Sequence, residues 1–219
     1  MKFSDYTMNV LENFSSINIG VKFLPGNTLR TMSPQKTIIA EATLPDTIDG
    51  EAAVYDMKRF LATLSLFDDP DIKFGKDRFT ISTDKAKATY VYAADNMILI
   101  PPSDLVLIEA MEETDTLVNV SWVNLQRVIR GAGVLGLEHI IFSMDNDSLY
   151  LGTKDVKDPT SDTFHVKLGE VVGAENYSVA IATENMKLLK ADYSVQISKR
   201  GVIRFAAPNI EYLIACEVV

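Results

Sequence analysis

Residues 55–67 read YDMKRFLATLSLF, and the Met-Lys pair inside this stretch returns in ENMKLLKADY at 184–193. In the first copy Met57, Phe60 and Leu64 recur at the spacing of one helical face, which predicts an amphipathic helix over 55–67. The second copy begins near Thr183, a residue type that caps helices, and predicts another helix up to Tyr193. Two similar segments so far apart in one chain indicate a duplicated unit.

Outward from these segments, the order of predicted elements is the same in both halves. A helix over 6–16 opens the first half, and a helix from the cap Ser121 to a glycine stop at Gly131 opens the second. Alternating polar and apolar residues predict strands over 71–75, 78–82, 87–92, 140–144, 149–151, 194–198, 202–205 and 210–216. This agreement favours duplication over the alternative, a single β-rich domain whose ends resemble each other by chance.

The 219 residues therefore divide into an N-terminal domain, 1–108, and a C-terminal domain, 109–219. Residues of about 96–115 form a predicted connector, which holds Pro101-Pro102 and an acidic stretch. Its apolar residues 105–108 argue against a disordered linker. Both domains combine helices with antiparallel hairpins, so the predicted fold class is α+β.

Composition excludes several classes of protein. The single cysteine, Cys216, rules out an intramolecular disulfide and a cluster of thiolate ligands. No apolar run approaches the ~18 residues that a membrane span needs, and the N-terminus lacks the pattern of a signal peptide. The sequence thus predicts a cytoplasmic protein without a membrane partner.

The net charge of −9, from 30 acidic and 21 basic residues, would by itself argue against nucleic acid. The predicted helices nevertheless concentrate basic residues, while strands and loops are strongly acidic. The basic residues of the predicted helices are Lys58, Arg59, Arg127, Arg130, Lys187 and Lys190. Arg127 and Arg130 are three positions apart, as are Lys187 and Lys190, so each pair would share one helical face. Such faces suit sequence-independent contacts with DNA phosphates; the alternative is an ordinary solvated face.

Sequence signatures of catalysis are weak. The motif Gly131-Ala-Gly133-Val-Leu-Gly136 follows a predicted helix and precedes a strand, the reverse of a dinucleotide-binding motif. His139 and His165 lie on separate predicted strands without a second ligand nearby, and the turn at Asp145 lacks the glycine and glutamate of a calcium loop. We expect no enzyme, no cofactor and no metal.

Several short motifs across the chain match one known family. They are Asn13-Phe-Ser-Ser-Ile-Asn18-Ile-Gly20, Ile48-Asp49, Ala53-Val-Tyr55-Asp56, Phe60-Leu61, Leu64-Ser65-Leu66, Ala93-Ala94-Asp95 and Asn185-Met186-Lys187. With this series the chain resembles the trimer-forming DNA polymerase sliding clamps of bacteriophages. The match is loosest in the loop lengths and around Pro101-Pro102.

The resemblance implies a duplicated processivity-clamp fold with two helices per domain, and a homotrimeric ring that encircles duplex DNA. Such a ring tethers the replicative DNA polymerase without catalysis, with helices facing the hole and sheets outside. It implies that the last strand of the first domain, about Lys87 to Tyr92, pairs with a strand near Phe164 to Leu168 of the next protomer. Tyr90, Tyr92 and Phe164 are the expected apolar contacts.

The resemblance also implies partners that dock short peptides near the connector and the C-terminus. The available apolar residues there are Leu105, Leu107, Ile108, Tyr212 and Ile214, and core packing is an equally open interpretation for each. An ATP-dependent clamp loader and transcription factors are further implied partners, in the cytoplasm of an infected host cell. Two alternatives remain: a β-rich, self-associating phage structural or assembly protein without a DNA role, and an enzyme that uses the region of His139 and His165.

Overall fold

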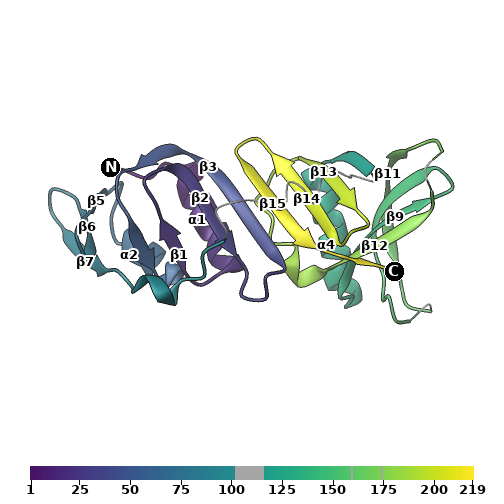
Figure 1. Cartoon of the computed structure of the whole chain (residues 1–219), viewed down its shortest axis with the longest axis horizontal. Coiled ribbons are helices and arrows are strands. Elements are labelled where there is room, and N and C mark those ends of the chain that lie inside the picture. The colour runs from purple at the N-terminus through teal and green to yellow at the C-terminus, as the bar shows by residue number, and fades with distance from the viewer. Residues whose placement is uncertain (102–115, 159, 174) are drawn as a thin grey trace. The chain divides into compact units, whose positions relative to one another are not determined.

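The computed structural model describes residues 1–101, 116–158, 160–173 and 175–219. The chain forms two compact units, Met1–Ser103 and Asp104–Val219, and each is described by itself (Figure 1). The domain boundary predicted between 108 and 109 lies outside the described residues. None of the helices in the described ranges has the length and apolar content that crossing a membrane requires.

Unit 1 contains the two helices predicted for the first half, which are confirmed. Helix α1, Asp5–Ile17, begins after Ser4, whose hydroxyl accepts a hydrogen bond from the backbone N–H of Thr7. Helix α2, Met57–Leu64, begins after Asp56, whose carboxylate accepts one from the N–H of Arg59 at 2.9 Å. Both helices bury the apolar face that the spacing predicts.

The strands of unit 1 form antiparallel pairs around an aromatic core. The pairs are β1 (Val21–Phe23) with β4 (Ala52–Val54), β2 (Gly26–Met32) with β3 (Ile38–Ile48), and β6 (Arg78–Ser82) with both β5 (Asp71–Phe74) and β7 (Lys87–Val91). The rings of Phe23, Phe60, Phe74 and Phe79 contact one another, with centroids 4.8 Å apart for Phe60 and Phe79. A 3₁₀ turn, η1 (Asp95–Met97), follows β7.

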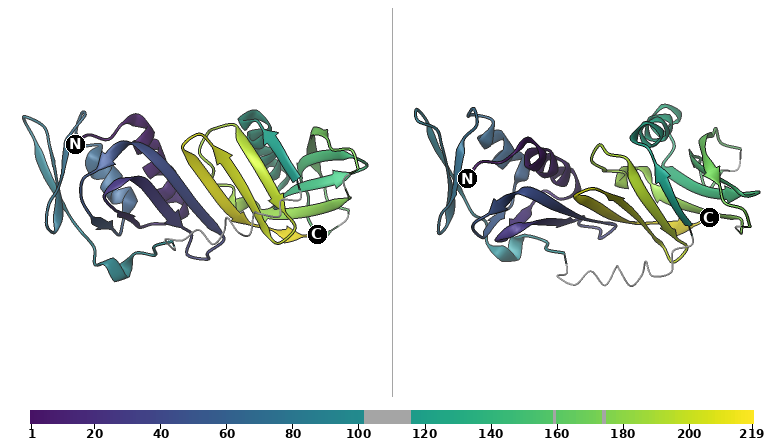
Figure 2. Two further views of the ribbon diagram at one scale, coloured as in Figure 1. Left: turned by 45° about the horizontal axis from the view of Figure 1, so that its top comes forward. Right: turned by 90° about the horizontal axis from the view of Figure 1, so that it is seen from above.

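The described part of unit 2 has two groups of antiparallel strands and the helix α4, Trp122–Leu135. In the first group the order of neighbours is β8 (Thr116–Val120), β13 (Tyr193–Ser198), β14 (Val202–Ala207) and β15 (Ile210–Ala215). In the second it is β11 (Phe164–Glu170), β10 (Ser148–Thr153), β9 (His139–Asp145), β12 (Tyr177–Ala182) and β16 (Glu217–Val218). Helix α4 lies against β9, β10 and β11, as Figure 2 shows.

The predicted glycine stop of the third helix is wrong. Helix α4 continues through Gly131 and Gly133 to Leu135, and Gly136 ends it with a φ of 67°. This left-handed conformation suits glycine, which has no Cβ to clash. The additional turn adds two apolar residues, Val134 and Leu135, to the helix.

The fourth predicted helix is also wrong. The segment contains a single 3₁₀ turn, η2 (Thr183–Asn185), and then runs without helical structure to β13. The N–H of Leu189 donates to the hydroxyl of Tyr212 at 3.0 Å, and its carbonyl accepts from the hydroxyl of Tyr193. Because side chains satisfy these backbone groups, the segment has no need of helical bonds.

Candidate functional site

The basic pair on α4 is presented to solvent by a helix fixed at its start. The hydroxyl of Ser121 accepts from the N–H of Asn124, and the carboxylate of Asp192 accepts from the N–H of Trp122 at 2.7 Å. Leu125, Val128 and Ala132 are fully buried, while Arg127 and Arg130 are exposed. The two guanidinium groups therefore belong to one exposed helix surface, as their spacing predicts.

Helix α2 presents a second basic pair. Lys58 and Arg59 are exposed directly after the cap Asp56, whereas Met57 and Phe60 are fully buried. Helix α1 differs, because its exposed residues are the acidic or neutral Asp5, Asn9, Glu12 and Ser16. Of the two helices described in unit 1, α2 thus carries the exposed positive charge and α1 carries none.

Lys187 and Lys190 do not share a helical face, because the segment that carries them is not a helix. Lys187 is half-buried and Lys190 exposed, and the intervening Leu188 is 7% exposed. Their spacing of three therefore does not bring them together in the way that the predicted helix implied. This removes the geometric argument for the pair, although each remains a basic residue on the surface of unit 2.

Strand β7 is an edge strand of unit 1. It pairs with β6, and within the described residues of that unit no strand pairs with its other side. The ring of Tyr90 contacts Phe60 at 5.2 Å, and that of Tyr92 contacts Phe79 at 4.8 Å. Burial raises the pKa of both phenols above its ordinary value. Both tyrosines thus face the core of their own unit, and the apolar residue that this edge turns outward is Val91, which is 61% exposed.

Strand β11 is an edge strand of unit 2, and Phe164 begins it. The strand pairs with β10, and the side chain of Phe164 is packed against α4. A Cβ on Gly131 would lie 2.9 Å from Cδ1 of Phe164, so the absence of a side chain at Gly131 makes room for the ring. Around Phe164 lies a groove of about 740 Å³, whose lining includes Val123, Arg127, Arg130 and Val134.

The apolar residues of this groove are unusually open to solvent for their type. Val123 is 58% exposed, Val134 79% and Phe164 36%. Extensive exposed apolar surface beside an unpaired strand edge is typical of a protein interface. The sequence analysis indicated Phe164 but neither Val123 nor Val134. It missed Val134 because the helix was predicted to end at Gly131, before that residue.

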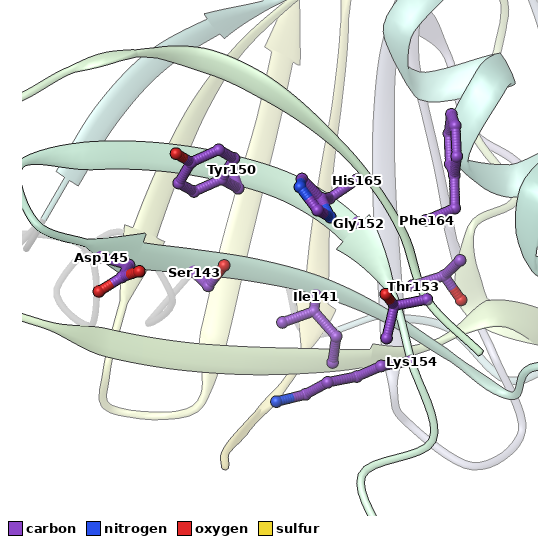
Figure 3. A pocket seen from close by; sticks show the side chains of 10 residues that line it. Ile141, Ser143, Asp145, Tyr150, Gly152, Thr153, Lys154, Phe164 and His165 are labelled. Carbon is purple, nitrogen blue, oxygen red and sulfur yellow. The ribbon is translucent and has the colours of Figure 1, made fainter. Parts of the chain in front are cut away.

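The opposite side of β9, β10 and β11 has a smaller hollow of about 320 Å³ (Figure 3). Figure 3 shows Phe164 turned toward the helix and His165 turned toward Tyr150, as the alternation of a strand requires. The rings of Tyr150 and His165 lie 5.5 Å apart, edge to face. Among the described residues no group of three or more His, Cys, Asp or Glu side chains is arranged to hold a metal ion.

The predicted partner-peptide residues divide into two sets. Leu105, Leu107 and Ile108 lie outside the described residues. Tyr212 and Ile214 are fully buried, so their assignment to a docking surface is wrong and the core interpretation applies. The Tyr212 hydroxyl holds the backbone of Leu189, which explains a polar group at that depth.

A different apolar surface lies where the connector leaves unit 1. Leu24, Leu99 and Ile100 are 46%, 37% and 44% exposed and line a hollow of about 230 Å³. The preceding Ile98 is packed on Gly20, where a Cβ would lie 2.9 Å from its Cδ1. Lys22 Nζ pairs with the carboxylate of Asp95 at 3.0 Å, which fastens η1 to β1. The apolar run before Pro101 was the sequence signal for this surface.

Comparison with known proteins gives matches over nearly the whole chain. Residues 2–107 match the family described as DNA polymerase processivity factor, and residues 118–218 match the family described as gp45 sliding clamp, C terminal. The curated "Sliding clamp" of Vibrio phage KVP40 is 29% identical and covers 99% of both chains. That of Escherichia phage RB69 is 29% identical and covers 99% of this chain and 97% of its own length.

Solved structures share the fold at low sequence identity. A PCNA2–PCNA3 complex from Sulfolobus tokodaii matches with a TM-score of 0.69 at 14% identity, covering 98% of each chain. A Helicobacter pylori beta clamp bound to a DNA ligase peptide matches with a TM-score of 0.71 at 9% identity, covering all of this chain and 65% of the other. The duplicated α+β architecture predicted from the sequence is thereby confirmed.

Proposed function

Because the chain belongs to the family of phage sliding clamps and is a non-catalytic DNA polymerase processivity factor, we propose that it closes into a homotrimeric ring around duplex DNA. Membership of this family sets aside both alternatives, the structural phage protein and the enzyme. The observation that carries the proposal is a pair of edge strands, β7 in unit 1 and β11 in unit 2. In the part of each unit that the structure describes, each pairs on one side only.

In the proposed ring, β7 of one protomer pairs with β11 of the next. Each edge presents unpaired N–H and C=O groups, which invite aggregation with other chains. Pairing of β7 with β11 would satisfy these groups. Two different edges give a head-to-tail contact that can close on itself. The apolar contacts come from Val91 on one side and from Val123, Val134 and Phe164 on the other. Tyr90 and Tyr92 support the first edge from within its unit.

DNA would contact the ring through its exposed basic helix residues. Arg127 and Arg130 on α4 and Lys58 and Arg59 on α2 are the main contacts, and Lys187 and Lys190 are subsidiary ones. Phosphate contacts of this kind are independent of sequence and weaken as salt is added. The acidic remainder of a chain with net charge −9 keeps DNA from binding elsewhere.

DNA and a DNA polymerase are the partners that the family implies. Among the similar structures, one is the C-terminal region of FEN-1 bound to A. fulgidus PCNA, and another is the beta clamp bound to a DNA ligase peptide. In this chain, a polymerase peptide would dock on Leu24, Leu99 and Ile100. Leu105, Leu107 and Ile108, which lie outside the described residues, are further candidates for contact with it. An ATP-dependent clamp loader would open the ring, transcription factors would use the same surface, and the site of action is the cytoplasm of the infected host cell.

Sedimentation and DNA retention test the ring. Wild-type protein should have about three times the 24.3 kDa protomer mass and should remain on nicked circular DNA after loading. Arg127→Glu with Arg130→Glu should lose retention, because the phosphate contacts are reversed. Its mass is measured alongside, because both side chains also line the groove around Phe164, and loss of retention counts for DNA contact only where the trimer mass is kept. Lys36→Glu with Lys157→Glu is the matched control, since both lysines are exposed in loops. A wild-type monomer at micromolar concentration would contradict the ring, and equal loss in the control pair would contradict the assignment of α4.

A further inference from the structure

Tyr90 lies where the edge strand of unit 1 meets its basic helix. Its hydroxyl donates a hydrogen bond to the backbone carbonyl of Asp56 at 3.0 Å, across 34 positions of sequence. Its ring contacts Phe60 of α2 edge to face, with centroids 5.2 Å apart. The same side chain thus touches α2 through both a polar and an apolar contact.

Asp56 is the residue that begins α2. Its carbonyl oxygen also accepts the first helical hydrogen bond, from the N–H of Phe60 at 3.0 Å, and its carboxylate caps the N–H of Arg59. A carbonyl oxygen has two lone pairs, so the tyrosine hydroxyl joins this bond without displacing it. The hydroxyl therefore binds the start of the helix directly before the exposed Lys58 and Arg59.

Tyr92 provides a natural comparison on the same strand. It lies two positions further on the same face, is half-buried like Tyr90, and its ring packs on Phe79. Its hydroxyl, however, bonds to Gly75 in the turn between β5 and β6, accepting from the N–H at 3.1 Å and donating to the carbonyl at 3.3 Å. Tyr92 thus fastens β7 to its own hairpins, and only Tyr90 of the two fastens it to α2.

We infer that Tyr90 is a positioning residue that couples the β7 edge to α2, so that pairing of β7 with a neighbouring protomer fixes the orientation of Lys58 and Arg59. The inference rests on the proposed ring, in which β7 is an intermolecular edge. Among the described residues of a lone protomer no strand pairs with the second side of β7, and such an edge is free to fray. Pairing stiffens the strand, and the hydroxyl bond transmits that restraint to the first turn of the helix.

Hydrogen exchange of the full-length protein, measured in dilute monomer and in concentrated ring, tests the coupling. In wild type, assembly should slow exchange of the amides of 57–61 as well as those of β7. Tyr90→Phe keeps the ring contact with Phe60 but removes the hydroxyl. In the assembled Tyr90→Phe protein the amides of 57–61 should exchange roughly fivefold faster than in assembled wild type, because one hydrogen bond is lost. The amides of β7 should stay protected. Tyr92→Phe should keep both effects.

A second readout separates positioning from mere stability. Tyr90→Phe should lower the salt dependence of retention on nicked circular DNA, because Lys58 and Arg59 are less well oriented, and Tyr92→Phe should not. Assembly-dependent protection of 57–61 that persists in Tyr90→Phe would overturn the coupling, as would an equal loss in Tyr92→Phe. A wild-type protein that never assembles would instead overturn the ring itself, and the coupling with it.

Discussion

The two halves of the chain place the same Met-Lys pair in different structures. Met57-Lys58 opens α2, whose first turn is capped by Asp56, whereas Met186-Lys187 follows a single 3₁₀ turn and continues without helical structure. Both copies bury their methionine, so the apolar pattern is preserved. The hydrogen-bond partners of the backbone differ. In unit 1 they are other backbone groups of the helix, and in unit 2 the backbone of Leu189 bonds to tyrosine hydroxyls. Apolar spacing thus determines which side chains are buried but not how the main chain is satisfied.

A substitution in the core of unit 1 should give the largest effect on stability and tests whether the two units unfold separately. Unit 1 is built around contacting phenylalanine rings, with Phe79 at their centre and fully buried. Phe79→Ala should destabilise unit 1 by about 3–5 kcal/mol, because a cavity replaces the ring. Hydrogen exchange resolved by unit measures the loss. Leu66→Ala, at a side chain that is 75% exposed, should change stability by less than ~0.5 kcal/mol. Equal loosening of both units by Phe79→Ala would show that they do not unfold separately.

The tyrosine bonds of unit 2 are the next test. Tyr212→Phe keeps the buried ring but leaves the N–H of Leu189 without its acceptor, at a cost of about 1–3 kcal/mol. Urea unfolding should show the loss, and the amide of Leu189 should exchange faster. Tyr55→Phe is the control, because Tyr55 is 47% exposed. A Tyr212→Phe protein with wild-type stability would mean that the hydroxyl does not hold this segment.

Much of the fold could be predicted because local pattern and tertiary structure agree. The cap Ser121 begins its helix as the sequence indicates, and the alternation in β5, β6 and β7 is present in the structure. The candidate site was predicted less completely. Arg127 and Arg130 share an exposed surface because helical geometry fixes their spacing. Tyr90 and Tyr92 turned inward because an edge strand has two faces, and sequence spacing does not say which faces the core.

The end of α4 gives a third test, because three glycines lie within and after its last turns. Gly136→Ala should destabilise the protein by about 1 kcal/mol, since φ there is 67°. Gly133→Ala should stabilise it by up to ~1 kcal/mol, because the position is helical and a Cβ would meet nothing within 4 Å. Thermal unfolding measures both.

Gly131→Ala in the same series links the helix to the proposed interface. Its Cβ would displace Phe164, so assembly should weaken while the protomer stays folded. If Gly133→Ala destabilised as much as Gly136→Ala, the helix would end before Gly133, in line with the stop predicted at Gly131. Opposite signs for these two changes are therefore the decisive result.

The smallest effect concerns the start of α1, where a titratable group supports the cap. The carboxylate of Asp46 accepts from the N–H of Ser4 at 2.7 Å and from its hydroxyl at 2.8 Å. Burial raises the pKa of Asp46, but hydrogen bonds from Thr7 and Ser4 outweigh it, so the pKa lies below its ordinary value of 3.8. This contribution is therefore present above about pH 4 and lost as pH falls through the lowered pKa.

Solvent screening keeps the contribution of Asp46 below ~1 kcal/mol. In urea unfolding, Asp46→Asn should therefore be less stable than wild type at pH 7, and the difference should shrink as pH falls below 4. Ser121→Ala, at the cap of α4, should cost about 1 kcal/mol at both values, because a serine does not titrate. If the Asp46→Asn difference were constant from pH 7 to pH 3, the carboxylate would contribute by its shape and not by its charge. The starts of α1 and α4 would then both be stabilised independently of pH. The two units would differ only in the segments that carry Met57-Lys58 and Met186-Lys187.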